Sequence, residues 1–424
     1  MRQEMTRKLS KFLVTGGKEL QGKIDVSGAK NAVLPIIAAS LLTSDKIILE
    51  EAPELLDVQV MGQVIESLGG KVKRNGKKLH ISTKEIMSIE TPFDLISKMR
   101  ASIVIMGPML ARKGRVRISH PGGCAIGSRP INWHLKGLEC LGAQVRMDHG
   151  FLDVSASRLK GAKIYLDFPS VGATENIMMA ASCAEGTTII ENAAQEPEIV
   201  DLANFINEMG GKIRGAGTNI VYIEGVKELH GTTHTVIPDR IEAGTFILMA
   251  AASGGEVLVR NVIPAHLKPL LAKLDEAGVI FREEDDGIRV IGKGCYNAVD
   301  IKTQVHPGFP TDLQAPILAM LTRAKGTAVI TETVFENRFM HVDELKRMGA
   351  DIKIEGRSAI VQGIENMNAA TVVASDLRAG AALILAALTA NGTTDIRDIH
   401  HIDRGYENLD LKLRSLGAEI TRVE

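Results

Sequence analysis

A glycine- and proline-rich segment, residues 119–130, presents a thiol and a guanidinium only five positions apart, at Cys124 and Arg129. Three glycines and two prolines in twelve residues exclude the interior of a helix or strand. The alternating residues 115–118 predict a strand before this loop, and residues 131–140 predict a helix after it. A nearby cation lowers the pKa of a thiol and also attracts anions. The loop therefore suits chemistry on an anionic substrate.

Other charges recur at a fixed distance from the glycines that open turns. Fourteen residues before Gly114, Gly254, Gly326 and Gly392 lie, in that order, Arg100, Arg240, Asp312 and Arg378. Twelve residues after the last two of these glycines lie Arg338 and Arg404, and Lys30 and Asn31 precede the first apolar helix. A cation at a helix start opposes the helix dipole unless an anion binds there.

These charges predict a phosphate or carboxylate site in a cleft between two domains. The cations expected to line it are Lys30, Arg100, Arg129, Arg338, Arg378 and Arg404. Simple solvation is the alternative for any single arginine, but it does not explain why position and sign recur.

The elements that position these residues are written six times along the chain. A glycine signature follows Leu68, Leu141, Met209, Ala277, Met348 and Leu416, at intervals of 68 to 73 residues. Each repeat reads as an apolar helix, a turn and strand, a loop, a second helix ending at the signature, and short strands. First helices that are apolar on nearly all sides indicate burial. We predict an α/β fold with mixed sheets around buried helices, in two pseudo-symmetric domains of three repeats each.

Composition narrows the functional class. A net charge of −1 gives no global field for nucleic acid or an anionic membrane, and no apolar run reaches the ~20 residues of a membrane span. With no signal peptide apparent, we expect a cytoplasmic protein. The cysteines lack metal-ligand spacing; Cys140 and Cys183 are interpreted as packing residues.

The dipeptide Asn75-Gly76 predicts a hairpin turn.

Five motifs resemble those of the UDP-N-acetylglucosamine enolpyruvyl transferase family. They are Ser27-Gly-Ala-Lys-Asn31, Pro121-Gly-Gly-Cys-Ala-Ile-Gly-Ser-Arg-Pro130, Pro307-Gly-Phe-Pro-Thr-Asp312, Phe335-Glu-Asn-Arg-Phe339 and His401-Ile-Asp-Arg-Gly-Tyr406. The likeness covers the chain from about residue 9 onward. It implies an inside-out α/β barrel in each of two domains, residues 30–237 and residues 1–29 plus 238–424, with the active site between them.

The resemblance also implies a reaction and its residues. The family transfers the enolpyruvyl group of phosphoenolpyruvate to the 3′-hydroxyl of UDP-N-acetylglucosamine and releases phosphate, the first committed step of peptidoglycan synthesis. No metal or organic cofactor is implied. Cys124 would be the proton donor, open to alkylation by a phosphonate epoxide of the fosfomycin type, and Asp312 the base, with Lys30 and Arg404 as further catalytic residues.

The binding residues implied by the resemblance form two sets. Phosphoenolpyruvate would be held by Lys30, Asn31, Arg129, Arg338, Arg378 and Arg404. UDP-N-acetylglucosamine would contact Arg100, Arg129, Pro130, Ile131, Asn132, Trp133, Phe168, Pro169, Ser170, Val171, Gly172, Asp312 and Val334.

Two segments depart from the family pattern. Asn132 and Trp133 stand where Asp and then Leu or Gln are usual, and Phe168-Pro169 stands where some members have Lys-Val. These departures bear on the uridine contacts. The alternative functions are a 5-enolpyruvylshikimate-3-phosphate synthase, whose family has Lys-Ser at Lys30-Asn31 and lacks the Cys124 loop, and a non-catalytic repeat scaffold.

Overall fold

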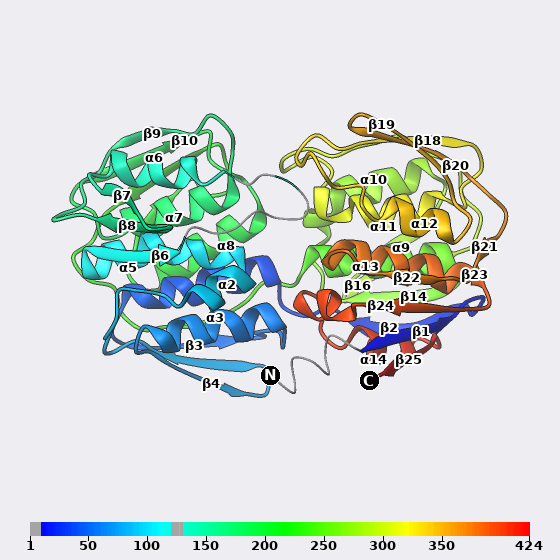
Figure 1. The fold of residues 1–424 in the computed structure, drawn as a ribbon, viewed down its shortest axis with the longest axis horizontal. Helices are drawn as coiled ribbons and strands as arrows, with labels where there is room; N and C mark the ends of the chain where they lie inside the picture. The colour runs from blue at the N-terminus through cyan, green and yellow to red at the C-terminus, as the bar shows by residue number, and fades with distance from the viewer. Residues whose placement is uncertain (1–9, 120–126, 128–129) are drawn as a thin grey trace. The chain divides into compact units, whose positions relative to one another are not determined.

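A computed structural model describes residues 10–119, 127 and 130–424, which divide into two compact units. The central unit contains residues 28–119 and 130–237. The terminal unit contains residues 10–27, 127 and 238–424. Figure 1 colours both units along the chain.

The central unit holds three sheets. One has the order β13-β3-β5-β4, with strands Thr233–Thr235, Lys46–Glu50, Lys78–Ser82 and Lys71–Asn75. A second has the order β6-β8-β7, with strands Arg115–Ser119, Phe151–Ser155 and Gln144–Asp148. The third has the order β11-β12-β10-β9, with strands Lys212–Arg214, Ile220–Glu224, Thr187–Glu191 and Lys163–Tyr165.

The three central sheets share one pattern of strand pairing. The strand that follows a buried helix pairs antiparallel with a hairpin strand on one side and parallel with a short strand on the other, as β3 does with β5 and β13. In the second sheet a single parallel bridge from Glu90 to Arg117 takes the place of the fourth strand. The sheets are therefore mixed.

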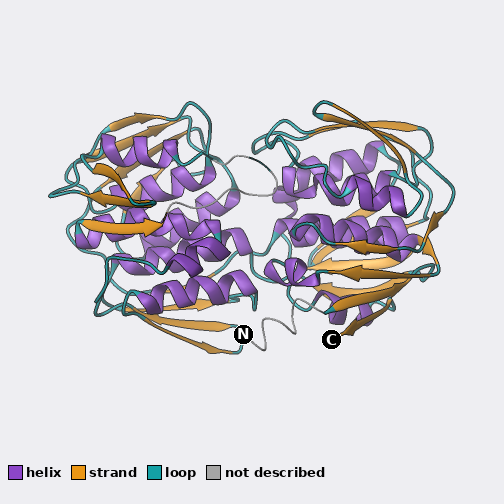
Figure 2. Cartoon of the chain, in the orientation of Figure 1, coloured by secondary structure: helices purple, strands orange, loops and turns teal. Residues whose placement is uncertain are grey.

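Helices fill the space between these sheets, as Figure 2 shows. The buried ones are α2 (Lys30–Ala39), α5 (Met106–Lys113) and α7 (Val171–Ala181), with the 3₁₀ turns η1 (Ser40–Leu42) and η2 (Arg100–Ile105) beside them. The second helices are α3 (Leu56–Ser67), α6 (Asn132–Cys140) and α8 (Pro197–Glu208), and α4 (Phe93–Lys98) precedes η2. Nine of the ten α2 residues are buried, as its apolar sequence predicts.

The terminal unit repeats this plan with three four-stranded sheets. The order β15-β16-β14-β2 joins Ile280–Glu284, Gly287–Gly292, Gly255–Arg260 and Leu20–Asp25. The order β17-β18-β20-β19 joins Ile301–Lys302, Thr327–Thr331, Ser358–Gln362 and Asp351–Glu355. The order β22-β24-β1-β25 joins Thr371–Val373, Thr393–Arg397, Lys11–Thr15 and Glu419–Val423. A two-stranded pair joins β21 (Met367–Asn368) and β23 (Ala390–Asn391).

Its helices follow the same division. The buried ones are α9 (Arg240–Ser253), α11 (Gln314–Leu321) and α13 (Leu377–Thr389), which contact one another, with η4 (Thr311–Leu313) leading into α11. The others are η3 (Pro264–Leu267), α10 (Lys268–Glu276), α12 (Val342–Arg347), η5 (Ile399–Arg404) and α14 (Leu409–Ser415). In the described part of the chain, no helix is long and apolar enough to cross a bilayer.

The glycine signature ends the second helix of every repeat. Its six glycines all have φ between +80° and +106°, the left-handed region that glycine enters without a Cβ clash. After α6, for example, the Gly142 and Ala143 amides donate to the carbonyls of Glu139 and Leu138, so the last carbonyls of the helix are satisfied. The repeat drawn from the sequence is thus confirmed, and so is the α/β class with mixed sheets around buried helices.

Among the described residues, the strands of the central unit form sheets of three or four strands, and those of the terminal unit form sheets of two or four. One detail differs from expectation. The hairpin turn is Gly76-Lys77, not Asn75-Gly76, because Asn75, the last residue of β4, pairs with Lys78, the first residue of β5. The positive φ of +57° at Gly76 explains why glycine is needed inside the turn.

Candidate active site

The strongest cluster of predicted site residues is an ion triad in the terminal unit. Asp312 lies in η4, where Oδ1 accepts from Arg338 Nη2 at 2.6 Å and Oδ2 accepts from Arg378 Nη2 at 3.0 Å. Arg378 Nε also reaches Oδ2 at 3.3 Å. Two residues found by one repeat spacing, Asp312 and Arg378, are therefore brought together at the starts of neighbouring buried helices.

Burial and charge oppose each other in this triad. Burial alone would raise the pKa of the Asp312 carboxyl, but Arg378 and Arg338 hold it well below its usual range. Burial likewise disfavours the charge of Arg378, yet Tyr406, Asp312 and Asp239 raise its pKa. The ion pair between Asp312 and Arg378 therefore holds both groups in their charged forms against the cost of burial.

Arg378 has unused hydrogen-bonding capacity. Its side chain is only 4% exposed, and within the described residues its buried Nη1 makes no hydrogen bond of normal geometry. The guanidinium carbon lies 5.3 Å from the centre of the Tyr406 ring, and the Tyr406 hydroxyl is within 3.0 Å of the Thr245 hydroxyl. A buried guanidinium with an N–H to spare suits an anionic ligand.

Two further predicted residues lie in the same unit. Arg404 is the last residue of η5 and is half-buried. Val334 is half-buried in the loop after β18, and its amide donates to Glu332 Oε1 at 2.7 Å.

The central unit places Lys30 and Asn31 as the first two residues of α2. Lys30 Nζ lies 2.7 Å from Asp57 Oδ2, and both side chains are nearly buried. Gly28, just before the helix, passes so close to the Glu51 carbonyl that an added Cβ would lie 2.1 Å from its oxygen. This close approach explains a glycine in the Ser27–Asn31 motif.

The expected nucleotide contacts gather at the starts of α6 and α7. Pro130 and Ile131 precede α6, Asn132 and Trp133 begin it, and Phe168, Pro169 and Ser170 lead into α7, which begins with Val171 and Gly172. The rings of Trp133 and Phe168 stack with centroids 5.4 Å apart and an interplanar angle of 20°. The two segments that depart from the family pattern therefore contact each other.

Arg100 opens η2 in the same unit. Burial, and secondarily the charge of Arg100, lower the pKa of His134 to about 4, so His134 is neutral at pH 7. His134 Nδ1 lies 2.9 Å from Asn176 Nδ2, which therefore donates to it.

Cys124 and Arg129 lie outside the described residues, so their roles remain predictions. The interpretation of Cys140 as a packing residue is wrong: it is exposed at the end of α6, where the helix turns its last residues to solvent. Cys183 is half-buried, and burial raises its pKa to about 11. Among the described side chains, no group of three or more His, Cys, Asp or Glu is arranged to hold a metal ion.

Sequence reasoning missed several residues that support the charged ones. Thr311 and Tyr406 lie inside quoted motifs, so their neighbours could have pointed to them. Glu332 and Asp57 carry no such signal, because each lies outside every motif and repeat-equivalent position singled out from the sequence.

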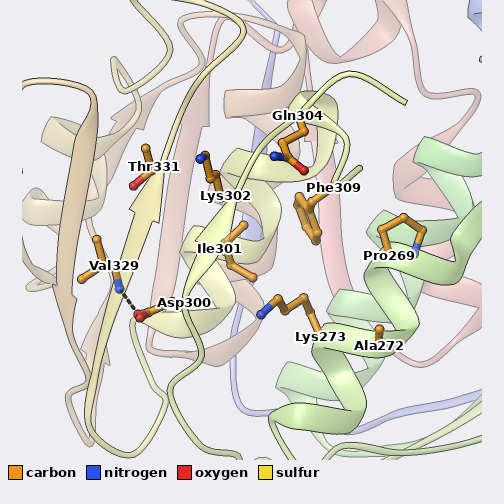
Figure 3. A pocket seen from close by; sticks show the side chains of 10 residues that line it. All are labelled: Pro269, Ala272, Lys273, Asp300, Ile301, Lys302, Gln304, Phe309, Val329 and Thr331. Atoms are coloured by element: carbon orange, nitrogen blue, oxygen red, sulfur yellow. Dashed lines mark hydrogen bonds between the residues drawn. The ribbon is translucent and has the colours of Figure 1, made fainter. Parts of the chain in front are cut away.

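A shallow pocket in the terminal unit contains none of the predicted site residues. It encloses about 490 Å³ between α10 and strands β17 and β18. Figure 3 shows the side chains that line it, namely Pro269, Ala272, Lys273, Asp300, Ile301, Lys302, Gln304, Phe309, Val329 and Thr331.

Comparison with known proteins gives concordant matches. A family described as EPSP synthase (3-phosphoshikimate 1-carboxyvinyltransferase) matches residues 14–413. UDP-N-acetylglucosamine 1-carboxyvinyltransferase 1 of Caldanaerobacter subterraneus subsp. tengcongensis is 60% identical, covering 97% of this chain and 99% of that protein. UDP-N-acetylglucosamine 1-carboxyvinyltransferase 2 of Carboxydothermus hydrogenoformans is 59% identical, covering 98% and 100%.

Solved structures agree in fold. The enolpyruvyl transferase NikO of Streptomyces tendae has a TM-score of 0.89 at 25% identity, covering 98% of this chain and 99% of that one. An EPSP synthase of Acinetobacter baumannii has a TM-score of 0.74 at 18% identity, covering 98% and 100%, which supports the fold alone.

Proposed function

This chain belongs to the enolpyruvyl (1-carboxyvinyl) transferase family, and from that premise we propose that it is a UDP-N-acetylglucosamine 1-carboxyvinyltransferase. It would transfer the enolpyruvyl group of phosphoenolpyruvate to the 3′-hydroxyl of UDP-N-acetylglucosamine and release phosphate, in peptidoglycan synthesis. Relatives named for this activity and 57–60% identical over nearly the whole chain support it.

The observation that carries the proposal is the triad of Asp312, Arg338 and Arg378. The reaction needs a group that accepts the hydroxyl proton and cations that hold the phosphate and carboxylate of the donor through a tetrahedral intermediate. The triad provides one carboxylate and two guanidiniums at 2.6 and 3.0 Å. We assign the base to Asp312 and donor binding to the two arginines.

The pairing of Asp312 with Arg338 and Arg378 suggests how the base becomes competent. A carboxylate held well below its usual pKa is a poor proton acceptor. An incoming phosphate or carboxylate would compete for the same guanidiniums and weaken their hold on Asp312. Donor binding would thereby raise the basicity of Asp312 only when there is a donor to react with.

The remaining assignments complete the proposal. Cys124 is the proposed proton donor; Lys30, Asn31, Arg129 and Arg404 would also hold the donor; residues 130–133 and 168–172, with Arg100 and Val334, would hold the nucleotide sugar. We propose a cytoplasmic enzyme acting on these two small molecules, without a nucleic-acid partner.

A direct assay tests this function against its nearest rival. The protein is mixed with phosphoenolpyruvate and either UDP-N-acetylglucosamine or shikimate 3-phosphate, and phosphate release is measured. We expect release only with the nucleotide sugar. Release with shikimate 3-phosphate alone would assign the chain to the EPSP synthases that its family description names.

The proton-donor assignment has its own test. Intact-mass analysis after exposure to fosfomycin should show one adduct, and peptide mapping should place it on Cys124. An adduct on Cys140 or Cys295, both exposed, would contradict the assignment.

A further inference from the structure

A buried carboxylate outside the predicted site, that of Glu332, accepts hydrogen bonds from the two segments that carry Arg338 and Asp312. Glu332 follows β18 and is 1% exposed. Its Oε1 accepts from the Thr303 hydroxyl at 2.8 Å and from the amides of Val334 and Phe335 at 2.7 and 3.1 Å. Its Oε2 accepts from the Thr311 hydroxyl at 2.8 Å. One carboxylate thus fixes the start of the loop that leads to Arg338 and the residue before Asp312.

The chemistry of these groups fixes the direction of each hydrogen bond. Glu332 Oε2 accepts from the Thr311 hydroxyl, so the single hydroxyl proton of Thr311 points to Glu332. The oxygen of Thr311 is therefore left as an acceptor, and Arg338 Nη1 donates to it at 2.9 Å. Arg338 Nη2 meanwhile donates to Asp312 Oδ1. The guanidinium is held on two different partners by its two terminal nitrogens.

We propose that Glu332, acting through the Thr311 hydroxyl, is a positioning residue that orients Arg338 for binding the anionic donor. The inference rests on the proposed function and extends it to two residues with no assigned role. With Nη1 bound to Thr311, Arg338 presents a single terminal nitrogen to Asp312. Without that anchor, the fork geometry of a guanidinium favours bidentate pairing with the same carboxylate, which would withdraw Arg338 from the donor.

A merely structural role fits the arrangement less well. Burying a carboxylate is costly, and apolar residues of similar volume usually serve a core at least as well. The bonds of Glu332 also converge on the two segments that hold Arg338 and Asp312.

The test uses a matched pair at position 311. Thr311→Val keeps the shape but removes the hydroxyl, whereas Thr311→Ser keeps the hydroxyl and removes a methyl group. A hydrogen bond to a charged group contributes about 1.5–3 kcal/mol, which is roughly 10- to 100-fold. We expect Thr311→Val to raise the KM for phosphoenolpyruvate at least ~10-fold, and Thr311→Ser to stay within about threefold of the wild type. The KM for UDP-N-acetylglucosamine should not change in either variant.

Glu332→Gln and Thr303→Val complete the design. A glutamine amide facing Thr311 would donate to it and turn the hydroxyl proton toward Arg338, so Glu332→Gln should also raise the donor KM. The double variant Thr311→Val/Glu332→Gln should be no worse than Thr311→Val alone, because the relay is already broken. Thr303→Val removes a different hydrogen bond to Glu332, away from Arg338, and should lower thermal stability without changing the donor KM.

Binding of inorganic phosphate, measured by calorimetry, separates the relay from the proposed function. If the wild type is active but the Val and Ser variants have equal donor KM values, the relay is wrong and the function stands. If the wild type is inactive with both substrates, the function is wrong, and weaker phosphate binding by Thr311→Val than by Thr311→Ser still supports the relay. Absence of phosphate binding by an inactive wild type overturns both.

Discussion

The central and terminal units each place a cation at the start of a buried helix, but they neutralise it differently. In the central unit Lys30 faces Asp57 at 2.7 Å. In the terminal unit Asp312 faces both Arg338 and Arg378. The central pair balances its charges, whereas the terminal triad has one positive charge more than its carboxylate can offset.

The difference shows how one repeated scaffold can serve two purposes. A buried charge is tolerated only with a partner, so a matched pair such as Lys30–Asp57 is stable without a ligand. Two arginines that share one carboxylate, one of them with an unused N–H, suit a place where an anion is to bind. The excess charge, rather than the mere presence of cations, distinguishes the stronger candidate for an anion site.

The largest expected effect comes from removing the carboxylate of the terminal triad. Asp312→Asn should lower kcat about 1000-fold, within the usual range for losing a general base. Donor binding should not weaken, because both guanidiniums lose a competitor. Steady-state kinetics and direct donor binding measure the two effects, and Asp351→Asn, on an exposed carboxylate of β19, is the control. A kcat within threefold of the wild type would remove Asp312 from the role of base.

The corresponding change in the central unit should affect stability first. Asp57→Asn removes the carboxylate that Lys30 meets at 2.7 Å in a nearly buried pair, which should lower the free energy of unfolding by about 3 kcal/mol. Urea denaturation measures it. Glu50→Gln breaks the exposed pair with Lys78 and should leave the midpoint unchanged. Equal midpoints for all three proteins would show that the central pair does not stabilise the fold.

Buried histidines give a pH dependence that both units share. The pKa values of His134 and His341 are both lowered to about 4, mainly by burial. In the unfolded chain each would be about 6.5. Stability from each neutral ring is present above pH 6.5 and is lost as pH falls toward 4, by up to about 3 kcal/mol per group.

The measurement compares wild type and His134→Gln by urea denaturation from pH 7 to pH 4.5. The wild type should lose more stability than the variant over this range, because only it must bury a titrating ring. Parallel curves would contradict the assignment of His134 as a buried neutral base.

The smallest effect is expected on the nucleotide side of the central unit. Trp133→Leu removes a stacked aromatic pair, which contributes about 0.5–1.5 kcal/mol beyond burial. The KM for UDP-N-acetylglucosamine should rise about three- to tenfold, with the KM for phosphoenolpyruvate unchanged. Phe168→Leu should match it, and the double variant should add little. A change in the KM for phosphoenolpyruvate instead would contradict the assignment of Trp133 and Phe168 to nucleotide-sugar binding.

Repetition made much of this fold predictable. Gly142 and Gly210 are recognisable from sequence as equivalent positions, because the same helix ending recurs. The fourteen-residue spacing alone identifies Asp312 and Arg378. A local sequence pattern recurs wherever the same backbone conformation recurs.

The partners of these charges could not be predicted in the same way. Glu332 meets Thr311 across 21 residues, and Lys30 meets Asp57 across 27, at positions that differ between repeats. Nor does the sequence state that Trp133 stacks on Phe168, since that contact depends on how α6 packs beside α7. Side-chain pairing is set by tertiary packing, which periodicity does not encode.

Strand β1 sits between β24 and β25, so the sixth repeat is completed by the first strand of the chain. During synthesis at about 5–20 residues per second, residues 11–15 would leave the ribosome roughly 20 to 80 s before the last strand that flanks them. In the central unit the widest such gap lies between β3 and β13, about 185 residues apart, so the wait there is less than half as long. A circular permutant that begins near residue 28 would bring β25 and β1 into direct succession and should shorten the time that this apolar strand spends exposed to aggregation and to chaperones.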